Sequence, residues 1–578
     1  MSIEIKKMIY GLKKKNLIIF TLVSFIALQN LIFQITFRLN FPYSVDFTDI
    51  FTPMFNFIVK NEFSFFINKG LHVMFFPKLI SFPNLYLNSF DVVNLTYVYW
   101  IVISLTVFIM YLIIKQTDKK LIWTLIPIAA FLYSPLTSSG YFMLSMLPWY
   151  FPMLGITLII YLFNRNTTNS KIFASSTSLA IFSTFSILLG VVSWIAGLVM
   201  LFKLNSQKQL ENKKWILLWI TSSTIIGICY LTLTSGFSEE TRVDLLFSYT
   251  GFSFIANFLS SSFRLKFEFL MIIVGTFSII LSFIYGWYFL KKNYFKQYFP
   301  WFVFLFSAFC GSIITALGRM QLENHLGNEP YYSTISQFFQ IGLIVLTGKI
   351  ILDFKINPKT LRKKIIVIIM ILLLISQMVL LIPSYYSGWQ RGEYYFQEKT
   401  EYVNCFSSNP NLGCLDFYYT QTPEFLSMIN YLIENKLSIF NESNGVSTNN
   451  ILYKEFGLLE NLPVITYQNN FQILNDNDPV DVSIYNLDDE IIQISGWFTV
   501  PIDSPPNTLF LLINEKPMIK NNNFQIISEP NDNSEKIKIE WSVFFLSGYL
   551  ETGCNSIQLI GESDRNKILL DNEFEICK

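Results

Sequence analysis

The sequence predicts a mainly α-helical membrane bundle of about eleven transmembrane helices, followed by a β-sandwich domain outside the membrane. Hydrophobic residues make up 52% of the 578 residues and charged residues only 14%, against roughly 25% charged residues in soluble domains. Apolar stretches long enough to cross a bilayer fill the first two thirds of the chain, and short β-type runs follow. We therefore expect a membrane domain (1–390), a connecting region with a short amphipathic helix (391–475) and the sandwich (476–578).

Each transmembrane helix is predicted from an apolar stretch of about 20 residues. The stretch 172–203 is too long for one span, has Gly190 and Ser193 near its middle, and has basic residues on both flanks. Two short helices forming a hairpin therefore fit better than one long helix. The predicted spans lie near 16–37, 93–114, 121–138, 142–163, 172–203 (two helices), 215–234, 268–290, 299–318, 332–352 and 364–386.

Basic residues cluster in every second loop, which predicts the orientation of the bundle. By the positive-inside rule their side is cytoplasmic, so the N-terminus lies inside and everything after residue 387 lies outside the cell membrane. The net charge of +1 supplies no basic stripe for nucleic acid and argues against that partner. The basic segments are the N-terminus, 115–120, 165–171, 203–214, 291–296 and 355–364.

Two outer loops, 38–92 and 245–263, are rich in Phe, which predicts short helices at the membrane interface. Beyond the last span, an amphipathic helix is expected over 423–436. From residue 480 the apolar pattern changes to short runs separated by Pro, Gly, Asn and Asp, as in an antiparallel sandwich. The five predicted strands are 490–500, 507–514, 536–545, 555–562 and 567–577.

The six cysteines are divided between the two regions. Cys229 and Cys310 lie in apolar runs and are expected to behave as small buried hydrophobes. The other four lie in the part predicted to be outside, which suggests two disulfides and leaves other pairings open. The suggested pairs are Cys405–Cys414 and Cys554–Cys577.

Polar residues that could perform chemistry lie in the predicted outer loops. Asp46 and Asp49 share one face if their segment is helical. A carboxylate there could deprotonate an acceptor hydroxyl or hold a divalent cation. Alternatively, they cap a helix that begins near Thr52, an interpretation that suits Asp49 better than Asp46. The same loops contain His72, Lys78, Arg319 and His325, which water-facing loops could also hold without any function.

Several short motifs resemble a poorly characterised prokaryotic branch of the GT-C superfamily of membrane glycosyltransferases. The basic N-terminus, the single first helix and the long loop with Asp soon after it are similar to that superfamily. Each motif is short, although together they cover most of the chain. They are HVMFFPKLI (72–80), SWIAGLVML (193–201), LGR (317–319), YYSTIS (331–336), YLIENKLSIF (431–440) and ISGW (494–497).

The resemblance implies sugar transfer from a polyprenyl-phosphate donor to a glycan, lipid or protein of the cell envelope, at the outer membrane face. Asp46 would be the base, with Asp49 as its partner or as a metal ligand. The donor tail would lie in a groove between helices, and membrane lipid would be a further partner. The donor phosphate would be held by cationic side chains. The residues assigned to the phosphate are His72, Lys78, Arg319 and His325.

The chain also departs from that branch, which keeps a second function open. Residues 70–73 read Gly-Leu-His-Val where the branch tends to have Asn-Glu-His-Arg, and Tyr331 stands where an Arg is common. A carboxylate and cations are thereby lost. A non-catalytic protein that binds or scaffolds envelope components remains the alternative. A transporter is least favoured, because the spans have few ionisable residues and no repeated pair of broken helices.

Overall fold

A computed structural model describes most of the membrane domain and the strands that follow it. The described residues are 3–38, 50–60, 73–137, 144–165, 169–206, 212–233, 243–265, 267–319, 327, 329–356, 361–408, 431, 432, 435, 437, 481–488, 491–501, 508–513, 516–521, 524–527, 536–546, 554–562 and 567–577. The strands are described by their backbone. The chain divides into two compact units, of which the first contains Met1–Pro42, Asn56–Leu87 and Val92–Gln397, and the second the remainder.

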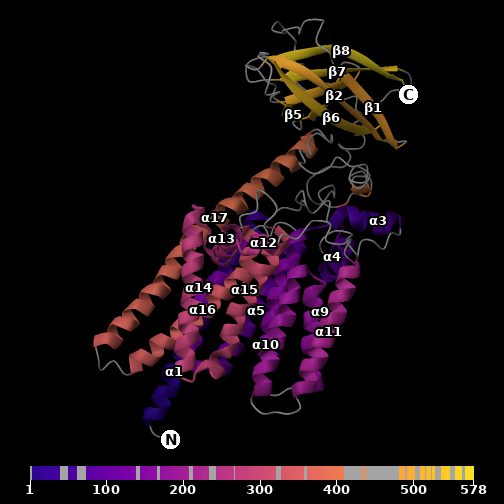
Figure 1. Cartoon of the computed structure of the whole chain (residues 1–578). Coiled ribbons are helices and arrows are strands. Elements are labelled where there is room, and N and C mark those ends of the chain that lie inside the picture. Colours follow the sequence, from indigo (N-terminus) through magenta and orange to yellow (C-terminus); the bar gives the residue numbers. More distant parts are fainter. Residues whose placement is uncertain are drawn as a thin grey trace. The chain divides into compact units, whose positions relative to one another are not determined.

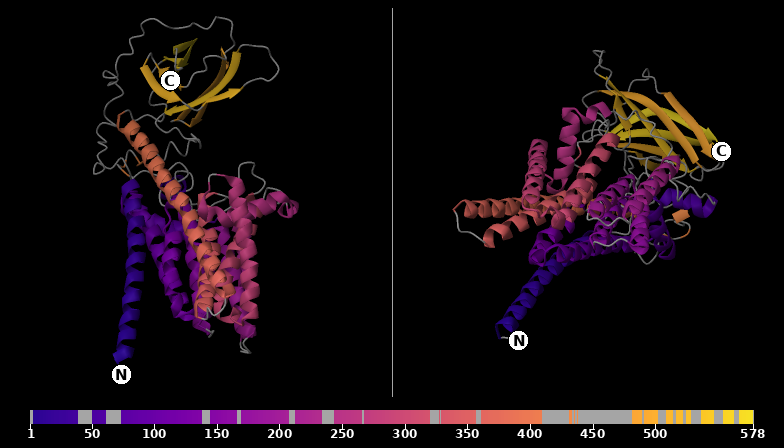
Figure 2. Two further views of the ribbon diagram at one scale, coloured as in Figure 1. Left: turned by 90° about the vertical axis from the view of Figure 1, so that its left-hand side faces the viewer. Right: turned by 60° about the horizontal axis from the view of Figure 1, so that its bottom comes forward.

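The first unit is a bundle of long apolar helices (Figure 1). Within the described ranges, nine helices are long and apolar enough to cross a membrane, which confirms the predicted helical bundle. The longest, α17, has 48 residues (Figure 2). The nine helices are α1 (Ile3–Phe37), α5 (Val93–Thr117), α8 (Tyr150–Phe163, preceded by η5, Leu144–Trp149), α10 (Val192–Ser206), α11 (Asn212–Leu233), α14 (Glu268–Lys291), α15 (Phe295–Arg319), α16 (Ser333–Ile356) and α17 (Leu361–Ser408).

Two shorter segments complete the eleven predicted helices. They are α6 (Leu125–Leu132), which continues η3 (Lys119–Thr124), and α9 (Ser170–Thr184). The predicted division of 172–203 into two helices is confirmed, because α9 ends and η6 (Leu188–Val191) leads into α10. Gly190 lies so close to α9 that a Cβ there would be 1.9 Å from the Ser183 carbonyl oxygen. Only glycine fits this turn. That α6 and α9 cross the membrane stays a prediction.

Short helices occupy both Phe-rich loops. The loop after α1 contains α3 (Thr52–Lys60) and α4 (Phe75–Leu87), and the loop after α11 contains α12 (Val243–Leu246) and α13 (Tyr249–Ser260). The predicted helices are therefore present, and their position at the membrane interface stays a prediction. The remaining short turns of the first unit are η4 (Pro135–Thr137), η7 (Ser261–Phe263) and η8 (Pro330–Tyr332).

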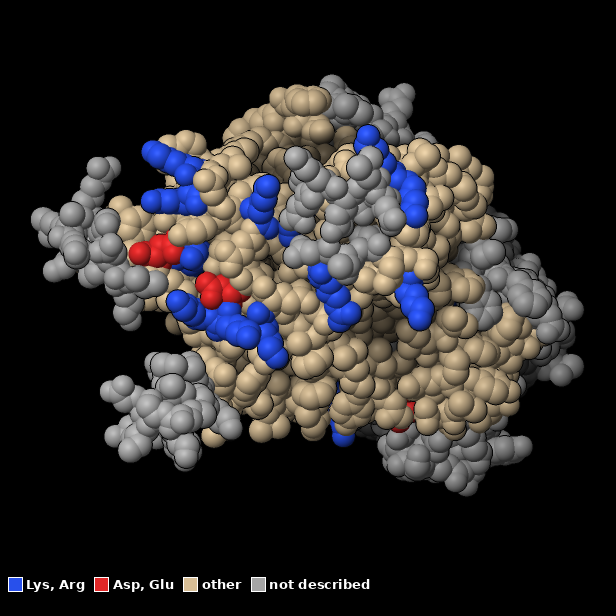
Figure 3. All heavy atoms as spheres, turned by 90° about the horizontal axis from the view of Figure 1, so that it is seen from below, with Lys and Arg blue, Asp and Glu red and all other residues tan. Residues whose placement is uncertain are grey.

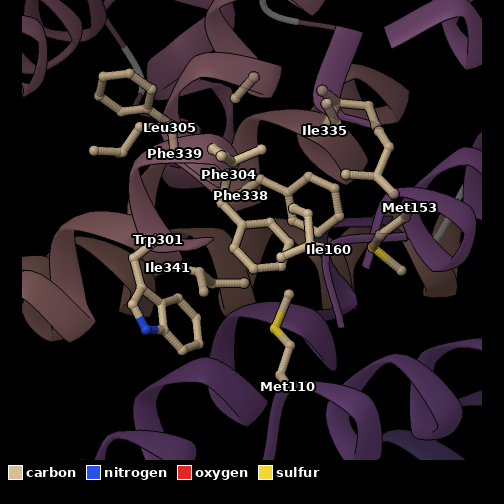
Figure 4. Close-up of a cluster of buried hydrophobic side chains, with 14 of the residues drawn as sticks. Met110, Met153, Ile160, Trp301, Phe304, Leu305, Ile335, Phe338, Phe339 and Ile341 are labelled. Carbon is tan, nitrogen blue, oxygen red and sulfur yellow. The ribbon is translucent and has the colours of Figure 1, made fainter. Parts of the chain in front are cut away.

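Helix α16 forms the centre of the bundle. In the most apolar stretch of α16, 89% of the residues are buried, against 6% in the corresponding stretch of α17. Helix α16 is therefore enclosed by protein, and α17 is largely exposed. Figure 4 shows the core that α16 shares with α5, α8 and α15. The Phe304 and Phe338 rings lie 5.0 Å apart, and those of Trp301 and Phe304 lie 5.5 Å apart. Such contacts between aromatic rings add to the stability that burial of their area provides.

The basic helix ends meet at one end of this bundle, which we call the basic end. It comprises the described helix ends and turns within 115–120, 165–171, 203–214 and 291–296. Figure 3 shows Lys and Arg side chains spread over this end, with few Asp or Glu among them. That it faces the cytoplasm stays a prediction. Hydrogen bonds that join its loops run from Asn164 Nδ2 to Gln116 Oε1 (3.0 Å), Lys203 Nζ to Asn164 Oδ1 (3.1 Å), Gln297 Nε2 to the Thr117 carbonyl (2.7 Å) and Tyr298 OH to Asp118 Oδ2 (2.9 Å).

The second unit contains two four-stranded antiparallel sheets, in the orders β1-β2-β6-β5 and β4-β3-β7-β8. Five of the strands coincide with the five predicted runs; β1, β4 and β5 are additional. The face-to-face packing that a sandwich requires stays a prediction, and the predicted helix 423–436 lies largely outside the described residues. The strands are β1 (Asp481–Asp488), β2 (Ile491–Pro501), β3 (Thr508–Ile513), β4 (Lys516–Asn521), β5 (Phe524–Ile527), β6 (Lys536–Leu546), β7 (Cys554–Glu562) and β8 (Lys567–Cys577).

Candidate functional site

Three arginines from three different elements lie at the end of the bundle opposite the basic end. Helices α14 and α15 are joined at the basic end, so the start of α14 and the last residue of α15, Arg319, lie at the other end. Arg264 precedes α14 by a few residues. Arg391 lies on α17 more than twenty residues beyond Ile365, where the apolar segment of that helix begins. Because about 20 residues cross a bilayer, Arg391 lies past the hydrocarbon core.

Arg264 is positioned by a short serine-rich turn. Residues 260–263 read Ser-Ser-Ser-Phe, and η7 within them is buried. The hydroxyls of Ser261 and Ser262 lie 2.8 and 2.7 Å from the Ser336 hydroxyl on the central helix α16. Phe263 packs edge-on against Phe131, with ring centroids 5.5 Å apart. These contacts fix the turn against the core and hold the half-buried Arg264 at its end.

Arg391 is positioned by close packing of α17. The Ser384 hydroxyl donates to the Ser262 carbonyl at 3.1 Å, and the Tyr385 hydroxyl donates to the Ala130 carbonyl at 2.8 Å. One turn later, a Cβ at Gly388 would lie 2.2 Å from the carbonyl carbon of Pro135, so only glycine allows this approach. The bond to Ser262 ties α17 to the same turn that carries Arg264.

The electrostatics of Arg264 show that two guanidinium groups lie near each other. The pKa of Arg264 is lowered to about 10, mainly by burial and also by the positive charge of Arg391, while Glu329 and Tyr395 act in the opposite direction. Arg264 therefore remains charged at physiological pH but is incompletely compensated. A bound anion would remove this penalty.

A cluster of aromatic rings adjoins the third arginine. Tyr331 and Tyr332 lie with ring centroids 4.7 Å apart, and Trp149 lies 4.9 and 5.7 Å from them. Burial raises the pKa of both tyrosines, and Glu329 raises it further, whereas the positive charge of Arg319 lowers it. Both phenols are thus neutral at physiological pH and retain a proton that can be donated to an anion.

Arg264 and Arg391 together can bind an anion, and Arg319 at the same end of the bundle acts on Tyr331 and Tyr332. Arg264, Arg319 and Arg391 carry three positive charges, and Glu329, which influences Arg264 as well as the tyrosines, carries one negative charge. Guanidinium groups donate paired, charge-assisted hydrogen bonds to phosphate oxygens. A partly desolvated cluster with excess positive charge at a helix-bundle end is suited to an anionic ligand.

The predicted site residues fall into different places. Arg319 lies at the same end of the bundle as Arg264, next to Tyr331 and Tyr332. Lys78 lies fully buried in α4. The residues just before it contact α9 and α11: the Phe76 and Phe182 rings are 4.8 Å apart, and the Val73 amide donates to the Tyr230 hydroxyl at 3.2 Å. Lys78 and Arg319, predicted to share one phosphate, therefore have different surroundings. Asp46, Asp49, His72 and His325 lie outside the described residues.

The sequence did not single out Arg264 or Arg391 as site residues. Arg391 stands in an aromatic segment, SYYSGWQRGEYYF (384–396), and Arg264 follows the serine run. An arginine just beyond an apolar span and among aromatic residues was a usable signal. Its proximity to another arginine 127 positions earlier was not visible in the sequence, because it depends on how α17 packs on η7.

No group of three or more His, Cys, Asp or Glu that could hold a metal ion occurs among the described residues. The pair for which a divalent cation was considered, Asp46 and Asp49, is not part of them.

Comparison with known proteins adds no relative: no protein-family model, no curated protein and no solved structure matches the chain.

Proposed function

We propose that this protein is a membrane glycosyltransferase that takes a sugar from a polyprenyl-phosphate donor and transfers it to a cell-envelope acceptor. The arginine cluster at the end opposite the basic loops is the observation that supports the proposal. The positive charge of Arg391 helps to lower the pKa of the half-buried Arg264, and Glu329 and Tyr395 act against it. Such an arrangement costs free energy unless an anion binds, and the donor carries its phosphate at the membrane surface.

In the proposed reaction an acceptor hydroxyl oxygen attacks the anomeric carbon of the sugar. The bond between that carbon and the phosphate oxygen breaks, and the phosphate leaves with the electron pair. Arg264, Arg319 and Arg391 stabilise the negative charge that develops on the phosphate. Asp46 accepts the hydroxyl proton, with Asp49 as its partner, as the resemblance to GT-C proteins implies. A divalent cation at these carboxylates remains part of the proposal.

The donor lipid is proposed to lie beside these arginines. The aromatic rings of Trp149, Tyr331 and Tyr332 adjoin the arginines, and Phe258 lies 5.2 Å from the Tyr332 ring. Aromatic side chains are favoured where a polar headgroup meets hydrocarbon, and their faces suit the apolar side of a sugar ring. The partly buried Tyr331 can in addition donate a hydrogen bond to a phosphate oxygen.

The test is turnover of polyprenyl-phosphate sugars in membranes that contain the full chain. We expect Arg264→Gln to lower turnover by 10- to 100-fold, because one charge-assisted contact contributes roughly 1.5–3 kcal/mol. The single variant Asp46→Asn should lose most of the wild-type turnover. The matched control is Arg165→Gln, which removes an exposed arginine beside Tyr161 at the basic end. An equal loss of turnover in Arg165→Gln and in Arg264→Gln would contradict the proposal.

The second candidate is a non-catalytic protein of the same architecture that binds an anionic envelope component. It is favoured by the loss of a carboxylate and a cation at 70–73 and of a further cation at Tyr331. Under this function, Arg264→Gln still weakens binding of the lipid phosphate, but no donor is turned over by the wild-type protein. Measuring donor binding and turnover side by side separates the two candidates.

The domain after the last span is proposed to be a disulfide-bonded sandwich that contacts the acceptor. The register of β7 and β8 pairs the backbones of Cys554 and Cys577 directly, which supports the predicted Cys554–Cys577 disulfide. Cys405 lies near the end of α17, and its predicted partner Cys414 lies outside the described residues. Mass analysis of peptides from the unreduced protein should recover 554 and 577 in one linked fragment; separate alkylated thiols would exclude this bond.

A further inference from the structure

An apolar groove runs along the halves of α14 and α15 that adjoin the basic end. Its cavity volume is about 620 Å³, within the range of roughly 300–1,000 Å³ that is usual for ligand pockets. Apart from Ser282, its lining consists of glycine and apolar side chains, and the Ser282 hydroxyl is already bonded to the Ile279 carbonyl at 2.7 Å. This lining offers hydrocarbon contact and no polar recognition. The occupant must therefore present a hydrocarbon chain.

The groove lies between two helices with different main neighbours: α14 packs mainly on α13, and α15 packs mainly on α16. Gly275 brings α14 so close to α13 that a Cβ would be 2.0 Å from the Ala256 carbonyl oxygen, and Gly342 of α16 lies against Leu305 of α15. The two helices are joined by a tight turn in which Asn293 has φ of 57° and the Tyr294 amide donates to the Phe289 carbonyl at 3.0 Å. The helices thus stay connected at the basic end while the space between them remains open.

The groove opens outward, and lysines surround its end. Phe283 and Trp287 are 73% and 64% exposed, so membrane hydrocarbon can enter between them. Lys291 Nζ lies 4.9 Å from the centroid of the Trp287 ring. Lys203 Nζ lies 5.8 Å from the centroid of Phe299, another lining residue. Lys292 and Lys296, on and just after the same turn, are also exposed.

We propose that this groove binds one acyl chain of an anionic phospholipid from the leaflet that meets the basic end, with the lipid phosphate at Lys291 and its neighbouring lysines. The apolar lining selects a hydrocarbon chain, and the lysines select an anionic headgroup over a zwitterionic one. The groove lies at the opposite end of the helices from Arg264, so this lipid is separate from the proposed donor. The proposal does not rest on the transferase function.

Gly286 provides a way to close the groove. It lines the groove, and a Cβ built on it meets no atom within 4 Å. We therefore expect a phenylalanine at this position to occupy part of the space of the acyl chain, since its Cβ meets no protein atom. Gly227 on α11 has the same open surroundings and does not line the groove, which makes Gly227→Phe the matched control.

The test measures lipid retention by the purified, delipidated full chain with phosphatidylglycerol and phosphatidylcholine as probes, read by native mass spectrometry. We expect the wild-type protein and Gly227→Phe to retain phosphatidylglycerol at least tenfold better than phosphatidylcholine. Gly286→Phe should lose at least tenfold of this binding. Lys291→Gln, a surface change that leaves the groove open, should lower the preference for the anionic lipid severalfold.

Three results would overturn the proposal. One is binding to Gly286→Phe equal to that of Gly227→Phe, which means that the lipid lies elsewhere. The second is equal retention of the two phospholipids. The third is displacement of phosphatidylglycerol by polyprenyl phosphate in the wild type but not in Gly286→Phe, which would assign the groove to the donor. Because no sugar transfer is measured, the first two results leave the proposed function untouched, whereas the third would move its donor away from the arginines.

Discussion

The two ends of the helix bundle both carry positive charge, but they use it differently. At the basic end the charged groups are mainly lysines at exposed helix termini, such as Lys213 and Lys292, and the loops are tied together by neutral side chains such as Asn164. At the opposite end, arginines are held half-buried by packed turns and lie among tyrosines. Solvated lysines are suited to fixing orientation in the membrane, whereas arginines held in place can recognise an anion.

The largest expected effect tests whether the two ends lie on opposite sides of the membrane. Single cysteines are introduced by Lys213→Cys at the basic end and by Thr250→Cys in α13, both at exposed positions. In intact cells a membrane-impermeant maleimide should label Thr250→Cys above the wild-type level and Lys213→Cys no more than the wild type. After the cells are opened, both should react. Labelling of Lys213→Cys alone in intact cells would reverse the predicted orientation.

The next largest effect concerns the chemistry of the arginines. Arg391→Lys keeps the positive charge but replaces the planar fork of donors with a compact ammonium. We expect donor turnover to fall by roughly tenfold, less than the fall for Arg391→Gln, because part of a contact worth roughly 1.5–3 kcal/mol is retained. The reciprocal control at the basic end, Lys214→Arg, should not alter turnover. A fully active Arg391→Lys would show that only the charge matters.

A smaller effect is expected for the packing that sets Arg391 in place. Gly388→Ala puts a methyl group into the backbone at Pro135 and should destabilise the protein by about 1–3 kcal/mol, with α17 shifted away from η4. Gly318→Ala is the control, because a Cβ at Gly318 on α15 meets no atom within 4 Å. Thermal denaturation in detergent measures both. If the two variants unfold at the same temperature, the close approach of α17 is not a determinant of stability.

The smallest effect is a gain of stability from removing a functional charge. The pKa of Arg264 is lowered by burial and by Arg391 to about 10, so its charge disfavours the folded state below pH 10. This penalty disappears between pH 10 and the ordinary value of 12.5. At neutral pH, Arg264→Gln should stabilise the ligand-free protein by about 1–2 kcal/mol, after allowance for partial exposure.

Arg165→Gln at the basic end is the control and should change stability by less than about 0.5 kcal/mol. Denaturation without added lipid measures both variants. A destabilised Arg264→Gln would mean that contacts of the guanidinium outweigh the penalty of its burial. Loss of turnover combined with gain of stability is the combination expected of a ligand site.

The sequence by itself determined which segments form the helices of the bundle. Runs of apolar residues specify helices wherever they are long enough, because every backbone polar group within a bilayer must be bonded internally. The division of 172–203 was predictable for a related reason: charges on both flanks cannot cross the membrane, and Gly190 permits the turn. The alternation of lysine-rich loops likewise predicted which helix ends would meet.

The tertiary structure decided which arginines meet and where a groove remains. Arg264 and Arg391 are distant in the chain and come together only because Ser384 and Gly388 bring α17 against the turns at Ser262 and Pro135. The groove between α14 and α15 depends on the packing of α14 mainly on α13 and of α15 mainly on α16. Helix formation is a local property of the chain, whereas the choice of packing partner depends on the shapes of surfaces far apart in the sequence. The bundle could therefore be predicted, and its two candidate binding sites could not.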